Sequence, residues 1–220
     1  MSLLRGAFTV GGWTLVSRVL GFARDMVIAR AIGTGWVADS WAVAFRFPNL
    51  FRRLLGEGAL NSAFVPMYAK RLEGDGKGAA DRLAEEIQSV MLPILFAVSA
   101  AAMIAMPWIM VVYAPGFSSD PAKFALTVDM TKIAFPYLMF MSMVALYSGV
   151  LNTHGRFAAA TAAQSLLNIG LLVAALAVQF ALRPEPGDPV WGMALAYGCV
   201  VAGAMQFLYL MAMLARGGIP

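Results

Sequence analysis

The stretch that decides the fold is SRVLGFARDMVIARAIG at residues 17–33, followed by ADSWAVAFRFPNLFRRLLGEGALNSAFVPMYAK at residues 38–70. Both stretches are mainly apolar, yet six arginines and three acids interrupt residues 18–57: Arg18, Arg24, Arg30, Arg46, Arg52, Arg53, Asp25, Asp39 and Glu57. An arginine at the centre of a bilayer costs about 2.5–3.5 kcal/mol on insertion scales. We therefore expect these arginines to face a watery cavity, a partner acid or a bound anion instead of lipid.

The rest of the chain is that of a membrane protein. Of the residues, 60% are hydrophobic and 13% are charged, against about 25% charged in a soluble domain. Four apolar stretches are long enough to span a bilayer, at residues 87–113, 122–151, 157–182 and 190–214. Two weaker segments, 7–32 and 36–69, carry the arginines. The pattern predicts an all-α, polytopic transmembrane bundle of six spans, forming a single lobe over residues 1–220.

Basic residues in the loops predict the orientation of the bundle. If the N-terminus is cytoplasmic, the cytoplasmic side holds Arg5, Lys70, Arg71, Lys77, Arg82, Arg156 and Arg216. The other side then holds Lys123 and Arg183, with Lys132 near its edge. Because basic residues concentrate in cytoplasmic loops, we expect both termini in the cytoplasm.

Helical spacing predicts which charges of the first segment share a face. At about 100° per residue, Arg18 and Asp25 lie on one side of a helix. Gly21 falls in the sector between Arg18 and Arg24, where a glycine permits a bend or a close helix approach.

The second segment carries a polar stripe. Asp39, Arg46, Arg53 and Glu57 recur at intervals of seven, seven and four residues, which places them on one face of a regular helix. Pro48 removes a backbone hydrogen bond within this segment and predicts a kink. We expect the acids to hold the arginines or to form gates.

The surplus of arginines over acids predicts an anionic ligand. Guanidinium groups are always charged, and their planar fork matches phosphate oxygens, so a diphosphate is an economical ligand. An alternative for Arg30, Arg52 and Arg53 is that each lies near a helix end and reaches the lipid headgroups. Gln164 and Asn168, one turn apart in the fifth span, are expected to hydrogen-bond to a neighbouring helix.

The sequence lacks the residues that other functional classes need. The chain has one cysteine, Cys199, and one histidine, His154, which together cannot form a disulfide or a zinc site of the usual kind. No phosphate-binding loop motif occurs, and no nucleophile has a nearby base. The basic residues lie among membrane-length apolar runs, which argues against nucleic-acid binding. We expect no metal, no cofactor and no catalysis.

The two quoted stretches resemble the MurJ (MviN) family of lipid II flippases, within the multidrug/oligosaccharidyl-lipid/polysaccharide exporter superfamily. The resemblance is dense over residues 14–70. It implies a bacterial inner-membrane transporter of peptidoglycan synthesis, with two helical lobes around a cationic cavity that receives lipid II. The first lobe has six helices. The implied partners are therefore the polyprenyl-diphosphate lipid, membrane lipids and a second six-to-eight-helix lobe missing from this chain.

The resemblance also assigns roles to residues. Arg18 and Arg24 match essential arginines of the first helix, with Asp25 next to Arg24. Arg52, with Arg53 beside it, matches an essential arginine of the second helix. Asp39 and Glu57 match acids linked to function or gating, and Arg46 stands at a position that is basic in relatives.

Three alternatives to lipid II flipping remain open. The first is a flippase for another polyprenyl-diphosphate-linked oligosaccharide, such as O-antigen, which uses the same diphosphate chemistry. The second is an enzyme acting on polyprenyl diphosphate, which needs a catalytic group near the arginines. The third is a scaffold that transports nothing. The missing second lobe leads us to expect a fragment or one half of a split protein.

Overall fold

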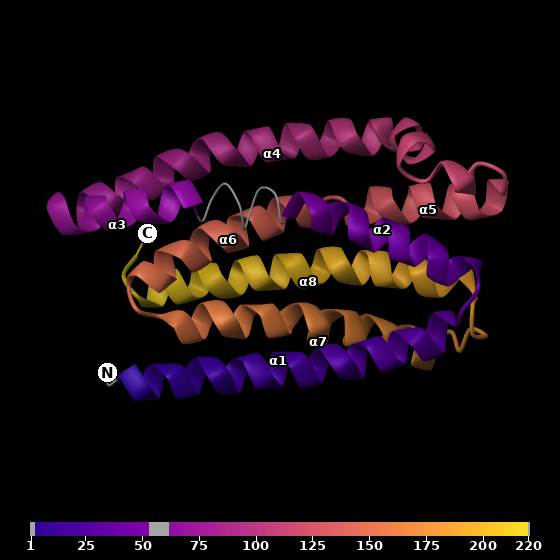
Figure 1. The fold of residues 1–220 in the computed structure, drawn as a ribbon, viewed down its shortest axis with the longest axis horizontal. Helices are drawn as coiled ribbons and strands as arrows, with labels where there is room; N and C mark the ends of the chain where they lie inside the picture. Colours follow the sequence, from indigo (N-terminus) through magenta and orange to yellow (C-terminus); the bar gives the residue numbers. More distant parts are fainter. Residues whose placement is uncertain (1–2, 53–61, 220) are drawn as a thin grey trace.

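The computed structural model describes residues 3–52 and 62–219, with the backbone alone for residues 3–7, 9, 51 and 52. Within these residues every regular element is a helix: α1 (Leu3–Ile32), α2 (Trp36–Arg52), α3 (Val65–Gly74), α4 (Lys77–Tyr113), η2 (Pro115–Phe117), α5 (Pro121–Ala134), α6 (Tyr137–Thr153), α7 (Phe157–Ala181) and α8 (Pro189–Arg216). The helices lie along one long axis, with α1 on one side and α4 on the other (Figure 1). The all-α prediction is confirmed.

Within the described part of the chain, four helical stretches are long and apolar enough to cross a membrane: α4, α5 together with α6, α7, and α8. The arginine-bearing helices α1 and α2 are not among them, so the count of six spans stays a prediction. The expected segment 36–69 covers α2, residues outside the described part of the chain, and the start of α3. The expected segment 122–151 contains a break between α5 and α6 at Phe135 and Pro136, because proline cannot donate the helical hydrogen bond.

Capping side chains fix where two of the spans begin. The carboxylate of Asp120 accepts hydrogen bonds from the backbone N–H groups of Ala122 and Lys123, both at 3.1 Å, and Pro121 opens α5. Asp188 does the same for Val190 at 2.8 Å at the start of α8. Both starts follow the pattern of a capping acid before a first-turn proline.

Small residues let α7 and α8 pack closely. A Cβ added to Gly170 on α7 would lie 2.5 Å from the Cβ of Ala202 on α8. A Cβ added to Gly198 on α8 would lie 2.6 Å from the Cβ of Ala174 on α7. Glycine and alanine four residues apart on each helix therefore face each other, which is how membrane helices approach closely. The two helices are therefore a closely packed pair.

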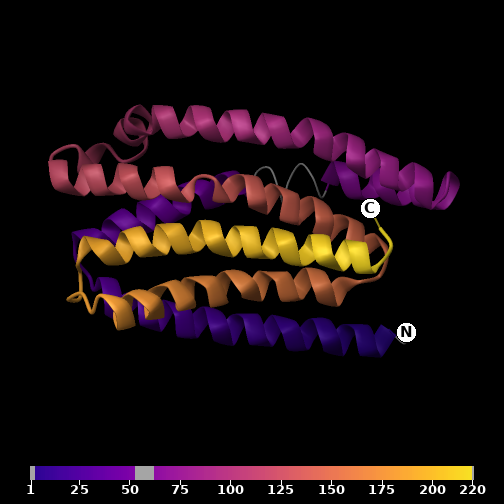
Figure 2. The same cartoon turned by 180° about the vertical axis from the view of Figure 1, so that it is seen from behind.

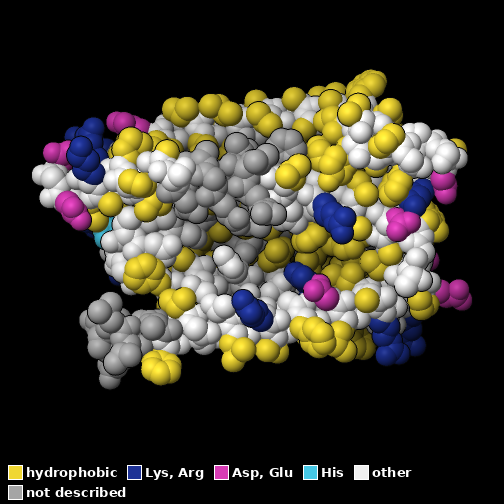
Figure 3. Space-filling view, viewed as in Figure 1, with side chains coloured by type: hydrophobic (Ala, Val, Ile, Leu, Met, Phe, Trp, Pro, Cys, Tyr) yellow, Lys and Arg dark blue, Asp and Glu magenta, His cyan; other side chains and the backbone are white. Residues whose placement is uncertain are grey.

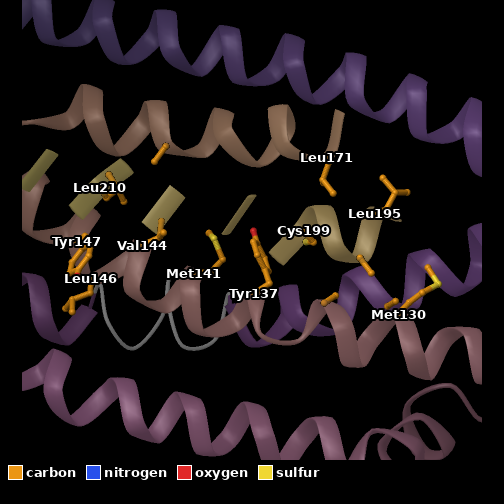
Figure 4. Close-up of a cluster of buried hydrophobic side chains, with 14 of the residues drawn as sticks. Met130, Tyr137, Met141, Val144, Leu146, Tyr147, Leu171, Leu195, Cys199 and Leu210 are labelled. Atoms are coloured by element: carbon orange, nitrogen blue, oxygen red, sulfur yellow. The ribbon is translucent and has the colours of Figure 1, made fainter. Parts of the chain in front are cut away.

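The core fills the space between α5, α6, α7 and α8. Figure 4 shows Met130, Tyr137, Met141, Leu171 and Leu195 pointing into this space. Each of these side chains is at most 8% exposed. Cys199 lies in the same cluster, fully packed and with a free thiol. It serves as a small core residue.

The start of α1 and the end of α8 lie at the same end of the bundle, as both ribbon views show (Figures 1 and 2). At this end a buried polar network joins three parts of the chain. The hydroxyl of Tyr68 on α3 donates to Asp81 Oδ1 on α4 at 3.0 Å. The hydroxyl has a single proton, so His154 Nε2–H, in the turn after α6, must donate to the hydroxyl oxygen, also at 3.0 Å.

At the opposite end, the loop between α7 and α8 is bonded to α1. The backbone N–H of Gly187 donates to the carbonyl oxygen of Ala31 at 2.9 Å. Gly187 has a φ of 86°, a conformation that suits glycine. The indole N–H of Trp191 donates to the carbonyl of Glu185 at 3.1 Å and holds the loop from its other side.

Candidate substrate-binding site

Helix α1 presents its charges to different surroundings. Arg18 and Arg30 are exposed, and the side chain of Asp25 is 66% exposed. The side chain of Arg24 is only 18% exposed, because it turns toward α7. Arg24 is therefore the one of these α1 arginines that the fold holds in a defined place.

The guanidinium of Arg24 has two partners. Its Nε and Nη2 donate to Asp25 Oδ1 at 3.0 and 2.7 Å. Its Nη1 donates to Asn168 Oδ1 on α7 at 2.6 Å. The prediction that Asp25 pairs with an arginine agrees with this geometry. Asn168 bonds to a neighbouring helix as expected, but its contact with a site arginine could not be read from spacing.

Gly21 lies against the same asparagine. A Cβ added to Gly21 would meet the Asn168 amide at 3.6–3.9 Å, which is ordinary van der Waals contact. Gly21 therefore lies where α1 contacts α7, but there is also room for a methyl group at this position. Gln164, one turn earlier on α7, is exposed and makes no hydrogen bond with the described part of the chain, so the contact expected for that residue stays a prediction.

A cavity of about 300 Å³ opens beside Arg24 and Asp25. Its other walls come from α2, where Trp41 and Phe45 stack with ring centroids 5.0 Å apart, and from Leu171 on α7. The cavity thus combines one charged end with an aromatic and aliphatic wall. Figure 3 shows a hollow on this face of the molecule, between the positions of α1 and α2, with basic and acidic side chains around it.

Asp39 has a different partner from the one predicted. Its Oδ2 lies 2.5 Å from Lys123 Nζ on α5, and the same ammonium lies 4.2 Å from the centre of the Phe117 ring. Asp39 is thus charge-paired, but with a lysine and not with an arginine of α1 or α2. The pair ties the start of α2 to the start of α5, because the tight α1–α2 turn places Asp39 at that end of the bundle.

The predicted polar stripe of α2 can be followed as far as Arg46. Asp39 and Arg46 are both exposed, and Arg46 has no ion-pair partner among the described residues. Pro48 is buried inside α2, and the helix continues through it to Arg52. The side chain of Arg52 and the whole of Arg53 and Glu57 lie outside the described residues. Their predicted roles stay predictions.

Metal ligands do not gather in this site. Among the described residues there is no group of three histidine, cysteine, aspartate or glutamate side chains that could hold a metal ion. The charged groups that line the cavity are Arg24 and Asp25, and the N–H donors of the guanidinium suit binding of an anion.

Comparison with known proteins gives the family. A family model described as lipid II flippase MurJ matches residues 28–220. A probable lipid II flippase MurJ of Rhizobium tropici is 44% identical over 94% of this chain and 38% of the relative. That of Rhizobium meliloti is 43% identical over 100% of this chain and 41% of the relative. The lipid II flippase MurJ of Burkholderia cenocepacia is 41% identical over 94% of this chain and 39% of the relative.

A solved structure supports the fold. The chain of a lipid II flippase MurJ in an inward closed conformation superposes with a TM-score of 0.74 at 22% identity. The match covers 94% of this chain and 42% of that chain. The present chain spans about two fifths of the length of these relatives. Its long apolar helices are those of a membrane protein. The chain therefore belongs to the lipid II flippase MurJ family.

Proposed function

We propose that residues 1–220 form the first lobe of a lipid II flippase, which moves this peptidoglycan precursor across the inner membrane without making or breaking a bond. The observation that carries the proposal is the Arg24 guanidinium, held by two contacts at the edge of the cavity between α1 and α2. A buried arginine in a membrane helix marks a ligand site by default. Its planar fork suits the diphosphate of the lipid.

The other charges of the first two helices extend this site. Arg18 and Arg46 are exposed and have no acidic partner among the described residues, so they can add positive charge around the diphosphate. Arg52 and Arg53 are proposed to complete the binding set. Asp39 and Glu57 are proposed to act as gating or charge-pairing residues, with Gly21 and Pro48 allowing the helices to adjust.

The ion pair between Asp39 and Lys123 is the contact that would act as the gate. It joins α2 to α5 at one end of the bundle, and the Asp39 carboxylate is 57% exposed. An exposed ion pair contributes about 0–1 kcal/mol, so it can open at little cost. We propose that this contact closes and opens as the helices move around the substrate.

The setting of the lobe is also part of the proposal. The start of α1 and the end of α8 lie at one end of the bundle, which supports placing both termini on the same side of the membrane. The basic loops favour the cytoplasmic side. A second helical lobe, outside this chain, would close the cavity, and membrane lipids would surround the rest. No cofactor and no nucleic acid take part.

The experiment uses a complete transporter. Residues 1–220 are joined to the remaining part of the Burkholderia cenocepacia relative, and the chimera is placed in liposomes that carry lipid II. Arg24→Ala should lower the rate of lipid II transfer about tenfold or more, because charged hydrogen bonds contribute about 1.5–3 kcal/mol each. Arg30→Ala is the matched control, since it removes the same charge from an exposed position of α1.

Three outcomes decide between the candidates. Equal rates for the Arg24 and Arg30 variants would contradict the proposal. Faster transfer of another polyprenyl-diphosphate oligosaccharide than of lipid II would assign the site to that lipid, because the described contacts recognise the phosphates alone. Release of phosphate from the lipid would indicate an enzyme.

A further inference from the structure

The amide of Asn168 joins α7 to α1 through both of its polar atoms. The side chain is 8% exposed. Its Oδ1 accepts from Arg24 Nη1 at 2.6 Å, and its Nδ2 donates to the carbonyl oxygen of Ser17 at 2.9 Å. An arginine can only donate and a carbonyl can only accept, so these partners fix which way the amide points.

The contacts leave part of the Arg24 guanidinium available. The group has five N–H donors: one on Nε, two on Nη1 and two on Nη2. The contacts in the described structure use one on each nitrogen, since Asp25 takes Nε and Nη2 and Asn168 takes Nη1. One donor remains on each terminal nitrogen. These two donors can still be offered to the oxygens of a phosphate group.

The neutrality of Asn168 matters as much as its position. Asp25 already supplies one negative charge to Arg24 at 2.7 Å. Arg24 and Asp25 together are neutral, so a second carboxylate at position 168 would make the group negative and repel an anion. An amide holds the guanidinium through its oxygen and adds no charge. It therefore orients Arg24 while preserving its attraction for phosphate.

We propose that Asn168 is a positioning residue, which aims the remaining N–H donors of Arg24 at a phosphate group without adding a second negative charge beside it. The inference rests on the proposed function, because it takes Arg24 as a phosphate-binding residue. It assigns a role in the binding site to α7, which carries no charged residue between Phe157 and Ala181. Helix α7 thus contributes the amide of Asn168 to the site.

The test measures selectivity for charge in the full-length chimera, placed in lipid nanodiscs. Native mass spectrometry gives the affinities for undecaprenyl diphosphate and for the uncharged undecaprenol, and their ratio is the readout. Asn168→Leu removes both hydrogen bonds and should lower the ratio about tenfold, as expected for losing a hydrogen bond to a charged group. Asn168→Asp keeps an oxygen for Arg24 but adds a charge, and should lower the ratio further.

Matched controls come from the same contact. Ser17→Ala should leave the ratio unchanged, because Asn168 bonds mainly to the Ser17 backbone and approaches the hydroxyl at only 3.4 Å. Gln164→Ala, on an exposed position one turn earlier, should also have no effect. A change in helix packing would weaken binding of both lipids and lower the unfolding temperature, and would leave the ratio unchanged.

The outcomes separate this inference from the proposed function. If Arg24→Ala lowers the ratio and Asn168→Leu does not, Asn168 does not position Arg24 and the inference is wrong. If Asn168→Asp gives a higher ratio than Asn168→Leu, the argument from neutrality is wrong. If Arg24→Ala itself leaves the ratio unchanged, the proposed function fails, and this inference fails with it. Should the leucine variant not fold, the aspartate variant decides alone, and a ratio equal to that of the unmodified chimera would overturn the inference.

Discussion

Helix α7 packs against α8 and against α1 through different contacts. Toward α8 it presents Gly170 and Ala174, which meet Ala202 and Gly198 so closely that an added methyl group would overlap. Toward α1 it presents Asn168, whose contacts are hydrogen bonds to a carbonyl and a guanidinium. Close apolar packing has one good arrangement and resists movement. A polar contact can exchange partners, so the α1 side is the one suited to holding a charge that must also bind a ligand.

The largest expected effect comes from breaking the α7–α8 contact. Gly198→Leu would drive a side chain into Ala174, whose Cβ would lie 2.6 Å from the new Cβ. Overpacking of this kind should lower the free energy of unfolding by about 3 kcal/mol. Circular dichroism during titration with denaturing detergent measures the change.

Gly78→Ala is the control for that substitution, because a Cβ at Gly78 meets nothing within 4 Å. It should be neutral or slightly stabilising, since alanine favours a helix over glycine. If the Gly198 variant unfolded at the same detergent concentration as this control, the close packing of α7 on α8 would be wrong.

A smaller effect is expected from a polar contact that stabilises the fold and has no proposed role in transport. Tyr68→Phe removes the hydroxyl that bridges Asp81 and His154, and leaves a nearly buried carboxylate without this donor. The expected cost is about 1.5 kcal/mol in the free energy of unfolding, measured by the same titration. Lipid II transfer by the folded chimera should persist, because this network lies away from the arginine cavity.

Tyr197→Phe provides the comparison for Tyr68, since its side chain is exposed. It should change the unfolding free energy by less than about 0.5 kcal/mol. A loss of transfer in the Tyr68 variant, with stability intact, would show that polar contacts outside the α1–α7 interface also serve transport.

The smallest effect is expected at the α1–α7 contact itself. Gly21→Ala would place a methyl group 3.6 Å from the Asn168 amide, an ordinary contact. Stability should stay the same or rise by up to about 1 kcal/mol, because glycine is a poor helix former. Thermal unfolding and the lipid II transfer rate both test this, with Gly11→Ala as the reference in open space on the same helix. A severe loss of transfer in the Gly21 variant alone would mean that α1 must bend there.

Features of the fold and the site could be predicted from the sequence where they depend on a single helix. Arginines inside apolar stretches predicted a charged cavity, and the adjacent Asp25 was available as a partner for Arg24. Asp120 before Pro121 caps the start of α5, as an acid before a first-turn proline does. These features depend on spacing and capping, which local sequence contains.

The sequence failed where two helices meet. Asp39 was expected to hold an arginine, but Lys123, far along the chain, lies closer. Asn168 was read as a structural polar residue, although it touches a site arginine. Both contacts depend on the rotation of each helix about its axis, and the small residues that set this rotation for α7 and α8 carry little signal in hydropathy. An asparagine inside an otherwise apolar span was the one clue available.

The hydrogen bond from Gly187 to Ala31 bears on how this protein can be engineered. The segment between α7 and α8 is rich in proline and charge, which makes it an inviting place for an epitope tag. An insertion there would detach the far end of α1 from its brace and disturb the helix that carries Arg24. Residues 118–119, where the backbone bonds only to its immediate neighbours, offer a safer position for a reporter.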